Sequence, residues 1–268
     1  CMFSDNMAAH GTIYSKDTCV YAYSTSFTDN YAMVYGGAIS SLNSDLTLDE
    51  CILTNNTSFD GGAVYANNSN ISMADCRVWR NSAFKTGSIF LNSGTANISR
   101  TDFSKNAMND YYYYARGSSI HSEGSDVSLS DCSFSDNYAY TGGSVSSSNG
   151  NLTVDSCSFS NDTAYVNYGV LYITDSIALV QNSNFSNGRS ISTSGAIYSD
   201  KSELKIISCS LKNFTAEKGS AMFSINSKIY ALDCRFEDNN STDTGIICSV
   251  YDDLTLENCS FKNGTSPE

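Results

Sequence analysis

One two-part signature returns along the whole chain at intervals close to 25 residues. Its first part is a corner of the form Cys-x-Phe-x-x-Asn, as in Cys132, Phe134 and Asn137. Its second part, Gly-Gly-Ala followed by an aliphatic residue, comes ten to twelve residues later, as in 61–64. The corners begin at Cys1, Thr25, Cys51, Cys76, Thr101, Cys132, Cys157, Ser183, Cys209, Cys234 and Cys259. Self-similarity at a fixed period of this length predicts a solenoid.

Each repeat also carries an alternating apolar pair just before its corner, such as Leu46/Leu48 and Leu152/Val154. This alternation indicates a strand with one buried face, and helical periodicity is absent. Stacked repeats pair each strand in parallel with its copies, and parallel crossovers are right-handed. The sequence therefore predicts an all-β, right-handed parallel β-helix of about ten coils of roughly 25 residues. The apolar pair, the corner and the Gly-Gly-Ala piece predict three short strands per coil.

The unbroken repeat predicts a single β-helix domain over residues 1–268, with one inserted loop. The step from Thr101 to Cys132 is 31 residues, and its surplus forms a Tyr-rich insertion around 109–116. Insertions in solenoids emerge on one face, often a binding face. Tyr111, Tyr112, Tyr113 and Tyr114 are therefore a candidate partner-binding loop, with a loop that packs on its own rod as the alternative. Neither end shows a capping repeat, so we expect a segment of a larger protein or assembly.

The repeat predicts an interior built from columns of like residues. We expect the corner Phe residues to stack, and Asn residues such as Asn30, Asn56 and Asn106 to form an internal amide ladder. Eight of the ten Cys residues occupy the corner position. They predict either a buried column of thiols or disulfides between neighbouring coils, such as Cys51–Cys76 and Cys132–Cys157.

The triplet Asn-x-Ser/Thr occurs thirteen times, where the composition predicts about seven. Such acceptor sites are typical of the surfaces of secreted proteins. Two triplets begin at Asn56 and Asn239, which belong to the predicted ladder and should be poor acceptors. The remaining candidate N-glycosylation sites are Asn55, Asn67, Asn70, Asn97, Asn151, Asn161, Asn184, Asn213, Asn240, Asn258 and Asn263. A β-helix rich in Ser, Thr and Asn also generates such triplets without using them.

Charge and composition exclude several function classes. The net charge of −13 without a basic stripe argues against nucleic acid, and no apolar run reaches the length of a membrane span. With two His residues and no Cys-x-x-Cys pair, we expect no metal and no other cofactor. An enzyme acting on polysaccharides needs carboxylates that converge from adjacent coils. The stretch one coil before the pair Asp252-Asp253 includes Asn226-Ser227 and no acidic residue, so we expect no enzyme.

The paired motifs resemble the repeats of the chlamydial polymorphic membrane proteins and of related microbial cell-surface β-helix proteins. The resemblance covers the whole chain. The matching residues include Phe3/Asn6, Gly36-Gly37-Ala38-Ile39, Gly61-Gly62-Ala63-Val64, Phe103/Asn106, Phe134/Asn137, Gly142-Gly143 and Phe236/Asn239. The resemblance implies an extracellular β-helical passenger that acts in adhesion or surface structure.

Together these features predict an extracellular, N-glycosylated structural or adhesive component of a cell-surface or fibrillar assembly. Its expected partners are other copies of itself, other surface proteins or glycans. A carbohydrate-binding adhesin module is the alternative, and a polysaccharide lyase or hydrolase is less favoured.

Overall fold

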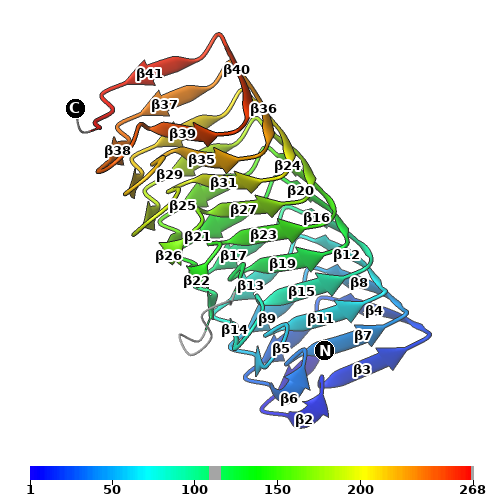
Figure 1. The fold of residues 1–268 in the computed structure, drawn as a ribbon. Coiled ribbons are helices and arrows are strands. Elements are labelled where there is room, and N and C mark those ends of the chain that lie inside the picture. Colours follow the sequence, from blue (N-terminus) through cyan, green and yellow to red (C-terminus); the bar gives the residue numbers. More distant parts are fainter. Residues whose placement is uncertain (109–115, 267–268) are drawn as a thin grey trace.

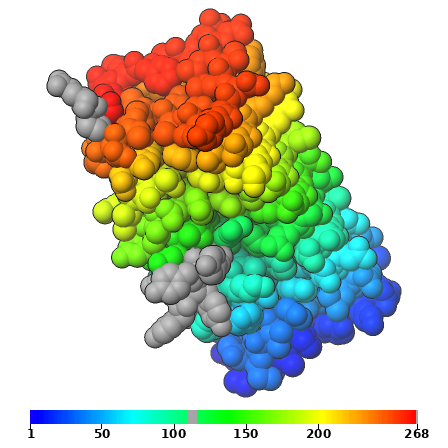
Figure 2. All heavy atoms as spheres, viewed as in Figure 1, coloured from blue at the N-terminus to red at the C-terminus, as the bar shows by residue number. Residues whose placement is uncertain are grey.

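The chain folds into stacked coils of four strands each, and the parallel β-helix is confirmed. The computed structural model describes residues 1–108 and 116–266. Each strand pairs in parallel with its copies in neighbouring coils, so four parallel sheets run along the molecule (Figure 1). We name these sheets A to D in the order in which a coil visits them. At about 4.8 Å per coil the stack is about 50 Å long, and Figure 2 shows the first and last coils at opposite ends of the body.

Sheet A contains the corner residues and sheet B follows the Asn of each corner. The strands of sheet A are β1 (Met2–Ser4), β5 (Ser26–Thr28), β9 (Ile52–Thr54), β13 (Arg77–Trp79), β17 (Asp102–Ser104), β21 (Ser133–Ser135), β25 (Ser158–Ser160), β29 (Asn184–Ser186), β33 (Ser210–Lys212), β37 (Arg235–Glu237) and β41 (Ser260–Lys262). The strands of sheet B are β2 (Met7–His10), β6 (Tyr31–Tyr35), β10 (Thr57–Ser58), β14 (Ser82–Ala83), β18 (Ala107–Met108), β22 (Tyr138–Thr141), β26 (Thr163–Asn167), β30 (Arg189–Ser190), β34 (Thr215–Ala216) and β38 (Asn240–Ser241).

Sheet C follows the Gly-Gly-Ala motif and sheet D carries the alternating apolar pair. The strands of sheet C are β3 (Ile13–Lys16), β7 (Ile39–Leu42), β11 (Val64–Asn67), β15 (Ile89–Asn92), β19 (Ile120–Glu123), β23 (Val145–Ser148), β27 (Leu171–Thr174), β31 (Ile197–Asp200), β35 (Met222–Ile225) and β39 (Ile247–Val250). The strands of sheet D are β4 (Cys19–Tyr23), β8 (Asp45–Asp49), β12 (Asn70–Ala74), β16 (Thr95–Ser99), β20 (Asp126–Ser130), β24 (Asn151–Asp155), β28 (Ile177–Gln181), β32 (Glu203–Ile207), β36 (Lys228–Leu232) and β40 (Asp253–Glu257).

The expected three strands per coil were wrong by one, because sheet B was not anticipated. Several of its strands, such as Thr57–Ser58, contain two residues, which is too short for alternation to be recognised. The other three strands lie where the sequence places them. In sheet A, Phe103 pairs with Phe134 across the long repeat, so the insertion leaves the register intact.

The interior consists of columns of like side chains. The rings of Phe103, Phe134, Phe159 and Phe185 are buried and stack with centroids 4.5–4.8 Å apart. The corner position forms a second column, in which thiols and hydroxyls have the same role. The Sγ of Cys132 and the Oγ of Ser183 each donate to the carbonyl two residues earlier. All ten Cys residues are free thiols, and six of the eight at the corner position are buried.

The predicted Asn ladder is present and ends in a buried acid. From Asn6 to Asn137, each side-chain Nδ2 donates to the Oδ1 of the next member at 2.8–3.3 Å. The last of these amides donates to Oδ1 of Asp162 at 2.9 Å. Asp162 is fully buried, and burial raises its pKa to about 7. In the next coil the column holds Gly188, where a Cβ would meet the ring of Phe214.

Candidate functional site

A polar groove follows the turns that join sheet C to sheet D. In the first coils these turns contain Asp17, Asn43 and Asn68, with φ angles of 53°, 49° and 50°. Asp and Asn tolerate this left-handed conformation better than most residues. The following residue turns inward: the backbone N–H of Ser44 donates to Oγ of Ser69 at 3.1 Å, which closes the floor of the groove.

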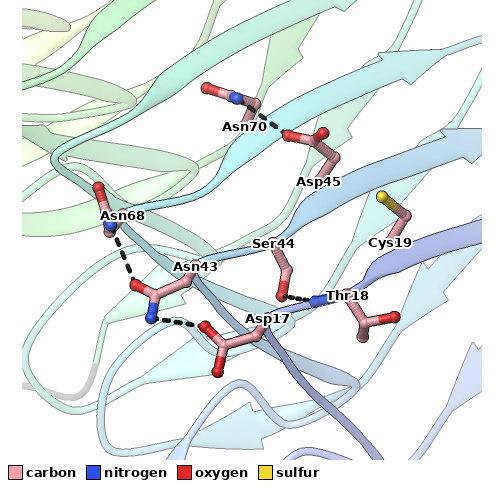
Figure 3. A pocket seen from close by; sticks show the side chains of 8 residues that line it. All are labelled: Asp17, Thr18, Cys19, Asn43, Ser44, Asp45, Asn68 and Asn70. Carbon is pink, nitrogen blue, oxygen red and sulfur yellow. Dashed lines mark hydrogen bonds between the residues drawn. The ribbon is translucent and has the colours of Figure 1, made fainter.

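Two rows of polar side chains border the groove (Figure 3). In the first row, Nδ2 of Asn43 donates to Oδ1 of Asp17 at 3.0 Å, and Nδ2 of Asn68 donates to Oδ1 of Asn43 at 3.0 Å. In the second row, Nδ2 of Asn70 donates to Oδ1 of Asp45 at 2.9 Å. The space between the rows has a volume of about 370 Å³. Within each row, these hydrogen bonds therefore hold the side chain of one coil against the side chain of the next coil.

The same turns form a second hollow of about 460 Å³ further along the rod. Its lining includes Asp126, Asn151, Asp175, Lys201 and Glu203. Here Nδ2 of Asn151 donates to Oδ1 of Asp126 at 2.7 Å. The pairing of a sheet D amide with the carboxylate one coil earlier thus repeats that of Asn70 with Asp45. A smaller hollow of about 250 Å³ on the face of sheet D continues this polar surface.

The lining defines which ligands the groove can hold. Amide donors, hydroxyls and carboxylate acceptors are the groups that orient a polar ligand by hydrogen bonds. Within residues 1–108 and 116–266, no group of three or more His, Cys, Asp or Glu side chains is arranged to hold a metal ion. The geometry therefore suits a ligand rich in hydroxyl groups.

The predicted glycosylation sites lie on the surface, with one exception. Ten of the eleven candidate asparagines are exposed, and Asn67 is half-buried. The two asparagines set apart as poor acceptors, Asn56 and Asn239, are buried in the ladder column. Four sites share the turn between sheets A and B and have left-handed φ angles, namely Asn55, Asn161, Asn213 and Asn263. Asn70 and Asn151 line the two hollows of the groove.

The candidate partner loop, Tyr111–Tyr114, lies outside the described residues. The aromatic residues that follow the core aliphatic of sheet C are largely covered: Tyr65, Phe90, Tyr172 and Tyr198 are buried. Their rings form a column against one another, as the 5.4 Å between the ring centroids of Tyr172 and Tyr198 shows. This column belongs to the packing of the rod.

One charged cluster was not anticipated. The side chain of Asp60 is largely buried beside Lys85, with Oδ2 and Nζ 3.8 Å apart, and burial raises the pKa of its carboxyl. Nearby, Nε2 of His121 lies 3.4 Å from Oε1 of Glu123, and this contact lowers the pKa of Glu123. The groove was also missed, although the recurrence of Asp or Asn at Asp17, Asn43 and Asn68 was a readable signal.

Comparisons with known proteins define the family. The model of the right-handed beta helix region matches residues 1–163 and 145–267, so the chain belongs to this family, and the predicted hand is confirmed. The search of curated proteins gave no significant match. Among solved structures, the A-module of the mannuronan C-5 epimerase AlgE6 of Azotobacter vinelandii is similar, with 10% identity and a TM-score of 0.35. The match covers 100% of this chain and 80% of that one. The described part of the chain has no helix long and apolar enough to cross a membrane.

Proposed function

We propose that this protein is an extracellular, N-glycosylated β-helix that serves as a structural or adhesive component of a cell-surface or fibrillar assembly. The observation that carries the proposal is the placement of the Asn-x-Ser/Thr triplets. They are more frequent than composition requires, and ten of the eleven retained candidates have exposed asparagines. Of the two remaining asparagines, Asn56 donates to Oδ1 of Asn81 within the amide ladder, and Asn239 is buried and donates to the carbonyl of Leu211.

The repeat explains why glycans would decorate a rod of this kind. A solenoid returns to the same turn once per coil, so acceptors at one turn face one side of the rod. Asn55, Asn161 and Asn213 occupy such a turn in coils that are not adjacent. Their separation gives each glycan space of its own. The resemblance to polymorphic membrane protein repeats agrees with a surface-exposed rod, and we assign no catalytic activity to it.

Surface labelling tests this function directly. An antibody against the chain should stain intact, non-permeabilised producing cells or the fibres around them. A brief protease treatment of intact cells should remove the signal. Staining that requires permeabilisation would contradict an extracellular role, and an intracellular marker stained in parallel controls for leakage.

The groove between sheets C and D supports a second candidate, a carbohydrate-binding adhesin module. A glycan on Asn70 or Asn151 would occupy the groove, because both residues line it. Site-resolved glycan mapping therefore separates the structural role from the carbohydrate-binding role. Glycans on Asn70 and Asn151 favour the structural role, whereas unmodified asparagines leave the groove open to a sugar ligand. A glycan array screened with wild type and with Asp126→Ala, which removes the carboxylate partner of Asn151, would then identify a ligand.

A polysaccharide lyase or hydrolase is the less favoured candidate. Two carboxylates of the groove, on Asp45 and Asp126, accept amide hydrogen bonds from the next coil. Incubation with acidic and neutral polysaccharides, followed by assays for new reducing ends and for unsaturated products, tests this candidate.

A further inference from the structure

Basic residues are concentrated in two neighbouring coils of the rod. Residues 77–116 contain six of the 15 Lys and Arg residues and only two Asp residues. The stretches on either side, 17–76 and 117–188, contain no Lys or Arg and seven Asp or Glu residues each. A chain with a net charge of −13 therefore carries a basic segment, residues 77–116, between two acidic ones, and we name it the basic belt.

Two cations of the basic belt have no carboxylate partner among the described residues. The other four are engaged: Arg77, Lys85 and Arg100 form ion pairs, and the guanidinium of Arg116 lies over the ring of Tyr172. Arg80 and Lys105 are exposed and occupy the turn between sheets A and B in successive coils, each with a φ of 54°. The backbone N–H of Arg80 donates to the carbonyl of Ser104 at 3.1 Å, so the two turns lie against each other. Like charges on directly adjacent strands repel each other, and an anion bound between them would relieve this repulsion.

The ring of Trp79 holds the guanidinium of Arg80 in place. Trp79 is the one tryptophan of the chain and lies half-buried on strand β13 of sheet A (Figure 1). The Cζ atoms of Arg77 and Arg80 lie 4.9 and 4.4 Å from the centroid of its ring. Arg77 also lies 3.8 Å from Asp102 of the next coil. A guanidinium is planar and stacks on aromatic faces, and its oriented N–H donors lose little freedom on binding, so Arg80 presents a prepared fork of donors to solvent.

We propose that Arg80, Lys105 and the ring of Trp79 form a binding site for an acidic sugar, one that carries a carboxylate or a sulfate group. This inference rests on the proposed adhesive role and names a ligand for it, at a site other than the groove between sheets C and D. A guanidinium binds an oxyanion through paired, charge-assisted hydrogen bonds. The ammonium of Lys105, one coil further, supplies a second charge, and the half-buried indole supplies apolar surface beside both.

Size and charge favour a saccharide over a larger acidic partner. Two coils are about 10 Å high, and the acidic segments 17–76 and 117–188 adjoin them on both sides. An acidic protein or a nucleic acid would extend over these segments and be repelled by them. A slender saccharide chain that places one or two acidic groups on the basic belt avoids this repulsion.

Because Trp79 is the one tryptophan, its fluorescence reports on this site alone. The purified chain is titrated with heparin oligosaccharides, with oligogalacturonates and with neutral malto-oligosaccharides, and calorimetry repeats each titration. The neighbouring turn carries the candidate glycosylation site Asn55, so every titration is also made with Asn55→Gln, which removes that acceptor.

Three variants that each remove one positive charge locate the binding. Arg80→Gln and Lys105→Gln change the proposed site, and Arg235→Gln is the matched control on strand β37 of the same sheet, further along the rod. All three positions are exposed, so the variants should fold, which circular dichroism verifies.

We expect binding of at least one acidic oligosaccharide and none of the neutral ones, with an affinity that falls as salt screens the charges. Arg80→Gln and Lys105→Gln should each weaken binding about tenfold, which corresponds to about 1.4 kcal/mol, and Arg235→Gln should leave it unchanged. Binding of heparin oligosaccharides alone would assign a sulfate, and binding of oligogalacturonates alone would assign a carboxylate.

Binding of neither acidic oligosaccharide overturns the proposal, as does equal weakening by Arg80→Gln and Arg235→Gln. Polyglutamate bound as tightly as the saccharides also overturns it and would assign the basic belt to an acidic protein. Surface labelling keeps the proposed function separate. A chain that binds an acidic sugar but stays inside cells refutes that function and leaves the site, whereas a surface chain that binds no acidic sugar refutes the site alone.

Discussion

The buried carboxyl of Asp162 makes the stability of the rod depend on pH. Its Oδ1 accepts hydrogen bonds from the backbone N–H and the side-chain amide of Asn137, each at 2.9 Å. Its Oδ2 has no hydrogen-bond partner among the described residues. In earlier coils the Nδ2 at this place donates to a backbone carbonyl, such as that of Phe103 for Asn137. The same register assigns the carbonyl of Phe134 to Asp162, and a protonated carboxyl can donate to it whereas an ionised one cannot.

The direction and size of the effect follow from the pKa. Burial raises the pKa of Asp162 from its ordinary value of 3.8 to about 7, so the folded state binds the proton more tightly than the unfolded state. The contribution of this group is therefore fully present below pH 4 and declines as the pH rises toward 7. At about 1.4 kcal/mol per pKa unit, the loss amounts to about 4 kcal/mol.

The variant Asp162→Asn tests this reasoning. An amide keeps the two hydrogen bonds from Asn137 and restores a donor without a titrating group. We expect the variant to be more stable than the wild type at pH 8 by up to about 4 kcal/mol, with a difference that shrinks as the pH falls toward 4. Chemical denaturation across this range, followed by circular dichroism, measures it. The exposed Asp136→Asn serves as the control for charge. A difference independent of pH, or a less stable variant at pH 8, would refute the account.

Four further predictions concern the columns and the glycans. Asn81→Ala removes the acceptor of the Asn56 amide and the donor to the carbonyl of Leu53, so it should lower the free energy of unfolding by about 3 kcal/mol or more. The control Asn97→Ala, at an exposed position, should change the free energy of unfolding by less than about 0.5 kcal/mol. Equal losses for the two variants in chemical denaturation would contradict the ladder. Alkylation in denaturant without reductant should add ten adducts per chain, because all ten thiols are free; a shortfall in pairs, seen by mass spectrometry, would indicate disulfides. In native alkylation, Cys157 should react slowly, because its hydrogen bond with Cys132 and its burial raise the thiol pKa. Enzymatic release of N-glycans in heavy-oxygen water should mark Asn55 and Asn161 but leave the buried Asn56 unmarked; a mark on Asn56 would mean that the ladder had opened to admit a glycan.

The interior could be predicted because each column depends on one residue type at one place in the period. Phe and Asn recur at fixed offsets from the start of the corner, as Phe134 and Asn106 do, and stacking of the coils in register places each of them directly over its copy in the neighbouring coil. Exceptions to the period were harder to foresee. Asp162 replaces an Asn within the ladder, and its consequence depends on burial that the local sequence does not reveal. Phe214 fills the space beside Gly188, which is a contact between coils.

The surface was less predictable than the interior, for a physical reason. The groove combines a turn residue such as Asn43 with the first residue of the next strand, Asp45, and joins both to neighbours a full coil away. Its shape therefore depends on stacking rather than on any local motif. Sheet B itself was readable from fragments such as Tyr31-Ala-Met33 and Thr163-Ala-Tyr165, in which a buried Ala separates two more exposed residues, had a fourth strand been expected.

The central claim is that this rod is a glycosylated extracellular protein. Intact-mass analysis of the native material, before and after enzymatic removal of N-glycans, tests it most directly. The account predicts a native mass that falls on deglycosylation by the mass of several N-glycans. A native mass that the enzyme leaves unchanged would contradict it.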